Sequence, residues 1–253
     1  MCPITVLRQH VPYDDKPRFK KTLLKPHLKT YWCIPPEQNG TFVAAMEDVL
    51  AVYGRPYDEN SPVICMDEKP FQLLGHTRGP LPMQQGVPQR VDYEYTRNGT
   101  CSIFIFTEPL SGWRYAIALP QRTKKDWAHC IRWLLNERYP QAEKVVLVMD
   151  NLNTHTPSSL YETFPAEEAF CLSQRLETHH TPKHGSWLNI AEIELSAMAA
   201  QCLGKKRIPC IKTLNEELAA WHTRRNQSQK GVDWQFTAKD ARIKLKRLYP
   251  IIV

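Results

Sequence analysis

The stretch VVLVMDNLNTHTP, residues 145–157, decides the fold and places an acid directly after an apolar run. Five apolar residues precede Asp150 without polar alternation, a pattern typical of a central strand that is covered on both faces and has parallel neighbours. Thr156 and Pro157 then predict the start of a helix. A carboxylate at the end of a buried strand loses hydration unless a cation compensates for it. Asp150 is therefore a candidate metal ligand.

Two further segments carry acids in apolar surroundings. PVICMDE, residues 62–68, reads as a strand that ends on Asp67, and strand alternation turns Glu68 to the opposite face. GSWLNIAEIELSAMAAQCL, residues 185–203, reads as one apolar helix that contains Glu192 and Glu194. Residues two apart on a helix differ by roughly 200° of rotation, so only one of these two can face a shared site. Periodicity does not decide which one, because both stripes are apolar.

The order of the remaining elements indicates the fold class. A hairpin of residues 101–109 and 113–120 follows the first strand, a helix capped by Thr123 precedes the second acid, and a short strand is expected over residues 175–182. We also expect three amphipathic helices, over residues 41–56 with Thr41 as N-cap, 213–227 and 237–249. This order predicts an α/β fold, a ribonuclease-H-like mixed five-stranded sheet flanked by helices, with a basic N-terminal arm and C-terminal helices.

Charge is distributed unevenly along the 253 residues. Residues 1–30 carry a net charge of +5, residues 31–200 carry −6 and residues 201–253 carry +8. A net-acidic centre between basic ends fits a body that holds carboxylates for metal and flanks that bind polyanions. Solvated helix faces explain the basic ends equally well, so charge alone leaves both explanations open.

Composition excludes several classes of protein. No apolar run approaches the roughly 18 residues of a membrane span and the N-terminus lacks a secretory pattern, so we expect a cytoplasmic protein without a membrane partner. The eight cysteines never form a closely spaced pair, which argues against a zinc ribbon and for reduced, buried thiols.

Three strings together resemble a known family. MDE at 66–68, VMDNLNTH at 148–155 and THHTPKHGSWLNIAEIELS at 178–196 are similar to DDE transposases of the IS630 branch of the IS630/Tc1/mariner superfamily, and the resemblance runs from about Leu24 through Pro209. Asp67 matches the first acid of the family, Asp150 the second and Glu192 the third, because LNIAE matches the family's Asn-x-x-Glu.

The resemblance implies a metal-dependent transfer of DNA strands. Water attacks a phosphodiester at the end of an insertion sequence, and the freed 3′-hydroxyl attacks a target with a TA dinucleotide. Two Mg²⁺ or Mn²⁺ ions are implied, with Asp67 bridging them and Asp150 and Glu192 each holding one. The implied partner is double-stranded DNA, bound by a homodimer.

Other residues of these strings are predicted to support the acids or to bind phosphates. His155 would orient an acid or contact a phosphate, and a purely structural histidine is an equally open interpretation. The predicted DNA-binding or supporting set is Asn151, His155, Lys183, His184, Lys205, Lys206 and Arg207, followed by the more distant Arg224, Arg225, Lys244, Lys246 and Arg247. The histidine spacings lack the helical pair of a zinc protease, which disfavours zinc hydrolysis.

These patterns predict three regions. Residues 1–60 form a basic arm, a linker and a short helix, the remnant of an N-terminal DNA-binding region; residues 61–204 form the catalytic domain, and residues 205–253 the basic C-terminal helices. The first residues show no helix-turn-helix pattern, so we expect a catalytic-domain fragment or a degenerate copy. A non-catalytic DNA-binding or dimerisation remnant is the main alternative, and a small-substrate metallohydrolase is the third. FPAEEAFCLSQ, residues 164–174, reads as an inserted surface loop.

Overall fold

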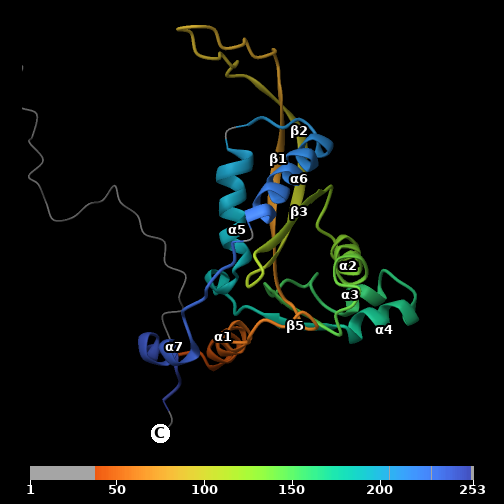
Figure 1. The fold of residues 1–253 in the computed structure, drawn as a ribbon, viewed down its shortest axis with the longest axis vertical. Helices are drawn as coiled ribbons and strands as arrows, with labels where there is room; N and C mark the ends of the chain where they lie inside the picture. Colours follow the sequence, from red (N-terminus) through yellow and green to blue (C-terminus); the bar gives the residue numbers. More distant parts are fainter. Residues whose placement is uncertain (1–37, 205, 229, 252–253) are drawn as a thin grey trace, which may run out of the picture. The chain divides into compact units, whose positions relative to one another are not determined.

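A mixed five-stranded sheet organises the computed structural model, which describes residues 38–204, 206–228 and 230–251 (Figure 1). The strand order is β3-β2-β1-β4-β5. Strands β1, β2 and β3 pair antiparallel, whereas β1, β4 and β5 pair parallel. The bounds are β1 Val63–His76, β2 Tyr95–Glu108, β3 Trp113–Leu119, β4 Val145–Met149 and β5 Leu176–His180. This topology confirms the predicted ribonuclease-H-like sheet. The predicted basic arm, residues 1–37, lies outside the described residues.

Strand β4 is the buried centre that its sequence predicts. All five of its residues are buried, and it lies between β1 and β5. Its parallel register pairs Cys65 of β1 with Val148, and Met149 with His180 of β5. Asp150 follows the last residue of β4 directly, so this carboxylate emerges at the carboxyl end of the strand as expected.

Strand β1 is longer than predicted, because it continues past Asp67 to His76. Beyond Cys65 it pairs only with β2, so Pro70, which lacks an N–H group, is tolerated on the free edge. The β1–β2 connection extends away from the helices (Figure 1). It exposes apolar side chains, among them Met83 at 75% and Tyr93 at 85%.

Helices cover both faces of the sheet. One core joins one face of the sheet to α1, α5 and α6, and the other joins the opposite face to α2, α3 and α4. The predicted cap of α2 is confirmed, since Thr123 and Asp126 form a reciprocal capping box. The helices are α1 Gly40–Tyr53, α2 Lys124–Trp133, η1 Leu134–Arg138, α3 Ser158–Tyr161, α4 Ala166–Gln174, η2 Ser186–Leu188, α5 Ala191–Met198, η3 Ala199–Leu203, α6 Ile211–Ser228, α7 Ala238–Lys244 and η4 Lys246–Leu248.

Three expectations about helices were wrong. The N-cap of α1 is Asn39 rather than Thr41, because the Asn39 side chain accepts the N–H of Phe42. The predicted loop of residues 164–174 contains helix α4, whose apolar side packs under the sheet. The single helix expected over residues 185–203 is divided into η2, α5 and η3.

Helix α6 covers the exposed edge of β3. The side chain of Asn215 accepts the N–H of Ala118 at 2.7 Å and donates to its carbonyl at 3.0 Å. Asn226 makes the same pair of bonds to Arg114, at 2.9 and 2.8 Å. These amides satisfy backbone groups that an edge strand would otherwise offer to another chain.

Six cysteines lie in the described part of the chain, and all are free thiols. Four of them are buried, as predicted, while Cys171 and Cys210 are exposed. Among the described helices, none combines the length and the apolar character that crossing a membrane requires.

Candidate active site

Asp67 and Asp150 occupy equivalent positions on neighbouring strands. The last β1–β4 pair is Cys65 with Val148, and each aspartate lies two residues further along its strand. Cys65 and Val148 face the core that contains α5. Because side chains two residues apart share a face of a sheet, Asp67 is directed toward the side that α5 covers, and Asp150 follows the end of the neighbouring strand.

The start of α5 is fixed beside Asp67 by a buried amide. The Nδ2 group of Asn189 donates to the carbonyl of Met66 at 2.8 Å, and its Oδ1 atom accepts the N–H of Ala191 at 3.1 Å. The hydroxyl of Tyr53 donates to the carbonyl of Leu188 at 2.7 Å. The bonds of Asn189 tie the first turn of α5, which carries Glu192, to the strand that carries the first acid, and the bond of Tyr53 ties the preceding turn to α1.

The two glutamates of α5 lie in different environments. Glu194 is 2% exposed, and its carboxylate lies 3.0 Å from Nε of Arg114 and 3.0 Å from Nη2 of Arg225. Glu192 is exposed, and no ion pair engages it among the described residues. Glu194 therefore neutralises buried arginines, which leaves Glu192 as the acid that is free to bind a ligand.

The carboxylate of Asp67 lies in a strongly unfavourable electrostatic environment. Its pKa is raised to about 7, chiefly by burial and further by the charges of Asp150, Glu192 and Glu68, against the opposing hydrogen bond from the Glu68 N–H. The charges of the other two predicted acids therefore act on Asp67. In the described part of the chain, however, no three acidic, histidine or cysteine side chains already form a group that could hold an ion.

The donor set nevertheless suits a hard divalent cation. Carboxylate oxygens are the ligands that Mg²⁺ and Mn²⁺ prefer, and a divalent charge would relieve the repulsion around Asp67.

His155 is a buried bridge between two acids. It is 0% exposed, with Nδ1 2.9 Å from Oδ1 of Asp150 and Nε2 2.9 Å from Oε1 of Glu68. Burial lowers its pKa, but the contacts with both carboxylates outweigh that effect and raise the pKa to about 9. A buried, doubly paired imidazole orients an acid and cannot reach a phosphate, so the phosphate-contact interpretation of His155 was wrong.

Three other predicted residues lie around one cavity. Asn151, Lys183 and His184 line a space of about 460 Å³ beside the N-terminus of α1. All three are exposed, and Asn151 adjoins Asp150 in the sequence. The structure therefore brings this predicted supporting set next to the second acid.

The basic residues after position 204 are engaged elsewhere. Lys206 pairs with Glu217 at 2.6 Å, and Arg207 donates to the carbonyls of Glu94 and Tyr93 in the β1–β2 connection. Arg225 is a partner of Glu194 at 3.0 Å, and its role as a phosphate contact stays a prediction. Lys205 lies outside the described residues, while Arg224, Lys244, Lys246 and Arg247 are exposed.

Sequence reasoning missed the part that Glu68 plays. Strand alternation correctly predicted that Glu68 faces away from Asp67. Its carboxylate, however, contacts His155, which also contacts Asp150. The available signal was the presence of an acid directly after Asp67 and of a histidine five residues after Asp150. Only the fold reveals that these two positions meet.

Comparison with known proteins agrees with this geometry. Residues 62–215 match the family model described as DDE superfamily endonuclease. The chain belongs to this family. No curated protein matches. The match confirms the predicted DDE relationship.

Solved structures of Mos1 mariner transposase share this fold. The paired end complex with Mg has a TM-score of 0.54 at 15% identity, covering 92% of this chain and 69% of that one. The Mos1 strand transfer complex has a TM-score of 0.52 at 15% identity, covering 82% and 64%, and the paired-end complex with left transposon end has 0.51 at 16%, also covering 82% and 64%. At this identity the likeness concerns the fold, and this chain spans about 64% of the latter two Mos1 chains.

Proposed function

We propose that this chain is a transposase catalytic domain that cleaves DNA and transfers strands at insertion-sequence ends, with Asp67, Asp150 and Glu192 as its catalytic carboxylates. The observation that carries the proposal is the placement of Asp67 and Asp150 at equivalent positions on two neighbouring parallel strands, with Asn189 fixing the start of the helix that carries Glu192 beside Asp67. We place the catalytic domain at residues 61–204, as the sequence predicts.

Asp67, Asp150 and Glu192 would hold two Mg²⁺ or Mn²⁺ ions, with Asp67 between them. Bound there, the ions would activate the attacking oxygen and stabilise the leaving oxygen of the phosphodiester. The Mos1 paired end complex that shares this fold contains Mg. For this chain, we propose Mg²⁺ or Mn²⁺ because the three proposed ligands are carboxylates.

The remaining residues position the acids and the DNA. His155 restrains Asp150, and Asn189 holds the helix that carries Glu192. Asn151, Lys183 and His184 would contact phosphates beside the second acid, since their side chains are exposed at one cavity. Positioning and charge neutralisation supply most of the rate enhancement in enzymatic phosphoryl transfer. A site made of acids and of residues that hold them in position suits this chemistry.

The proposed partner is double-stranded DNA, comprising insertion-sequence ends and a TA-containing target, bound by a homodimer. The exposed apolar side chains of the β1–β2 connection, including Met83 and Tyr93, support a contact with a second protein chain. We propose that the protein acts in the cytoplasm.

Nicking of supercoiled plasmid tests the enzymatic proposal. The wild-type chain with Mg²⁺ or Mn²⁺ should convert the plasmid to its open form, and Asp150→Asn should lose this activity by about 10³-fold or more. Asp233→Asn is the matched control, because Asp233 is exposed and forms no ion pair with any described residue. Equal nicking by wild type and Asp150→Asn would contradict the proposal.

Salt dependence of DNA affinity separates the alternatives. A chain that binds duplex DNA but nicks none would be the non-catalytic remnant, whereas nicking together with a steep decrease in affinity with salt supports the transposase domain. An affinity for DNA that does not change with salt would argue against a DNA partner altogether.

A further inference from the structure

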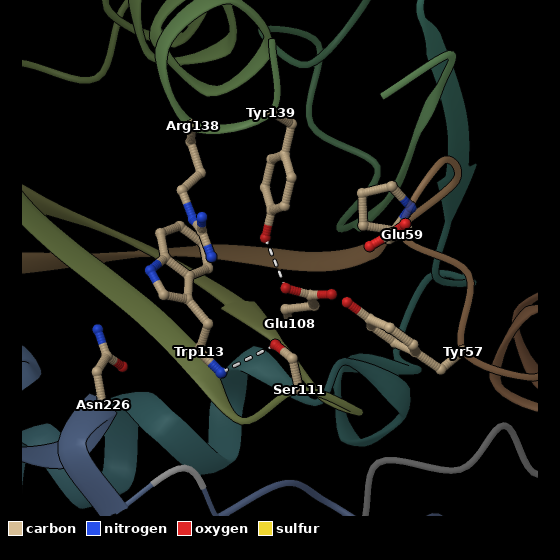
Figure 2. A pocket seen from close by; sticks show the side chains of 9 residues that line it. Tyr57, Glu59, Glu108, Ser111, Trp113, Arg138, Tyr139 and Asn226 are labelled. Carbon is tan, nitrogen blue, oxygen red and sulfur yellow. Dashed lines mark hydrogen bonds between the residues drawn. The ribbon is translucent and has the colours of Figure 1, made fainter. Parts of the chain in front are cut away.

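A cavity of about 370 Å³ lies at the end of the sheet opposite the proposed catalytic acids. It forms where β2 ends at Glu108 and β3 begins at Trp113, and the segment before β1 contributes Tyr57 and Glu59 (Figure 2). Antiparallel β2 ends where β1 begins, whereas Asp150 follows the far end of β4. This cavity is therefore separate from the site described above.

Glu108 is a buried acid without a counter-ion among the described residues. It is 3% exposed, and its Oε2 atom accepts a hydrogen bond from the hydroxyl of Tyr139 at 2.8 Å. Figure 2 shows the hydroxyl of Tyr57 near the other end of this carboxylate. A carboxylate removed from water is destabilised unless a cation compensates for it, and one neutral donor compensates only in part.

Two acids, Glu59 and Glu108, and one cation, Arg138, line this cavity. The charge of Glu108 is the largest cause of the raised pKa of Tyr57, and Glu59 and Asp58 add to it. Arg138 acts in the opposite direction but does not outweigh them. The cavity therefore attracts cations and repels phosphate, which distinguishes it from a DNA-binding surface.

The aromatic walls already hold one cation. The guanidinium carbon of Arg138 lies 4.6 Å from the ring centroid of Trp113 and 4.8 Å from that of Tyr139. Such stacking is favourable for cations on electron-rich rings. Arg138 is exposed and forms no ion pair with a described carboxylate, so it leaves Glu108 uncompensated.

We propose that this cavity binds a primary ammonium or guanidinium group, with Glu108 as the counter-ion and the rings of Tyr57 and Tyr139 as walls. The volume is near the lower end of small-ligand pockets, about 300–1,000 Å³, so it suits one flexible basic chain rather than a duplex. That chemistry can come from a free polyamine or from a lysine or arginine of a polypeptide. This inference is independent of the proposed catalytic function.

Calorimetric titration of the full chain tests the inference with two probes. One probe is cadaverine, a free diamine, and the other is a blocked peptide with a single lysine between glycines. Glu108→Gln, which keeps the shape and the bond to Tyr139, should weaken binding about tenfold. Glu216→Gln is the control with the same charge change, since Glu216 is exposed on α6 and forms no ion pair with a described residue.

Two further variants give independent outcomes. Tyr57→Leu changes an exposed wall residue without threatening the fold and should weaken binding, whereas Arg138→Ala removes a competing cation and should strengthen binding a few-fold. Tighter binding of cadaverine assigns the cavity to free amines, and tighter binding of the peptide assigns it to polypeptides. Equal affinity of wild type and Glu108→Gln, or no binding of either probe at about 10 mM, would overturn the inference.

Discussion

The imidazole of His155 lies 2.9 Å from the carboxylate of Asp150, in a position with 0% exposure. Its other nitrogen is 2.9 Å from Glu68, whose carboxylate points away from Asp67 on the opposite face of β1. The second acid of the proposed site is therefore restrained by a fully buried residue that also contacts an acid of the opposite face.

Replacing His155 tests this restraint. His155→Ala leaves two carboxylates near each other without their shared cation, and we expect the free energy of unfolding to decrease by about 3–5 kcal/mol. Urea unfolding followed by circular dichroism measures the change. His129→Ala is the control, because His129 is exposed on α2 and should have a much smaller effect. Equal stability of His155→Ala and wild type would refute the bridging role.

The two glutamates of α5 should separate stability from activity. Glu194→Gln weakens two contacts to buried or half-buried arginines and should cost about 3–5 kcal/mol of folding free energy. Glu192→Gln changes an exposed side chain, so stability should stay within about 0.5 kcal/mol while metal-dependent nicking is lost. Thermal unfolding and plasmid nicking of both variants provide the comparison. A stable Glu194→Gln chain without nicking activity would reverse the assignment.

Sequence patterns predicted the sheet because β4 and the elements around it follow simple burial periodicities. The unbroken apolar run before Asp150 required a covered central strand, and the hairpin and the Thr123 cap of α2 followed local rules. The sequence pattern predicted the end of the first strand at Asp67 and so missed its continuation to His76, which includes Pro70, a residue unusual inside a strand. Pro70 is tolerated because β4 stops pairing with β1 at Cys65, and this depends on the tertiary structure.

The sequence predicted individual candidate residues of the site but not the contacts between them. Periodicity could not choose between Glu192 and Glu194, since both lie among apolar neighbours; burial of Arg114 at the edge of the sheet makes the choice. The contact between Glu68 and His155 joins residues 87 positions apart, so no local pattern contains it. The same holds for Arg225, whose partner lies on another helix.

Acid should weaken the contact between α1 and α7. The hydrogen bond from Arg242 lowers the pKa of Glu47 below 4.5, with a further contribution from Tyr249 and against the effect of burial. Because the folded-state pKa is depressed, this contribution to stability is present above the unfolded value and is lost as the pH falls through the folded value. Unfolding between about pH 6 and about pH 3 should therefore depend on pH less steeply in Glu47→Gln than in wild type. Identical slopes would contradict the expected linkage.

Removing an amide from α6 should expose the edge of β3. Asn215 satisfies both backbone groups of Ala118, so Asn215→Leu leaves a donor and an acceptor unpaired and should cost about 1–3 kcal/mol. The freed edge can also pair with another chain, so we expect light scattering to rise at a lower temperature during heating. Glu216→Leu introduces the same side chain at the next, exposed position of α6 and controls for added hydrophobicity. If both variants unfolded and aggregated like wild type, Asn215 would not protect this edge.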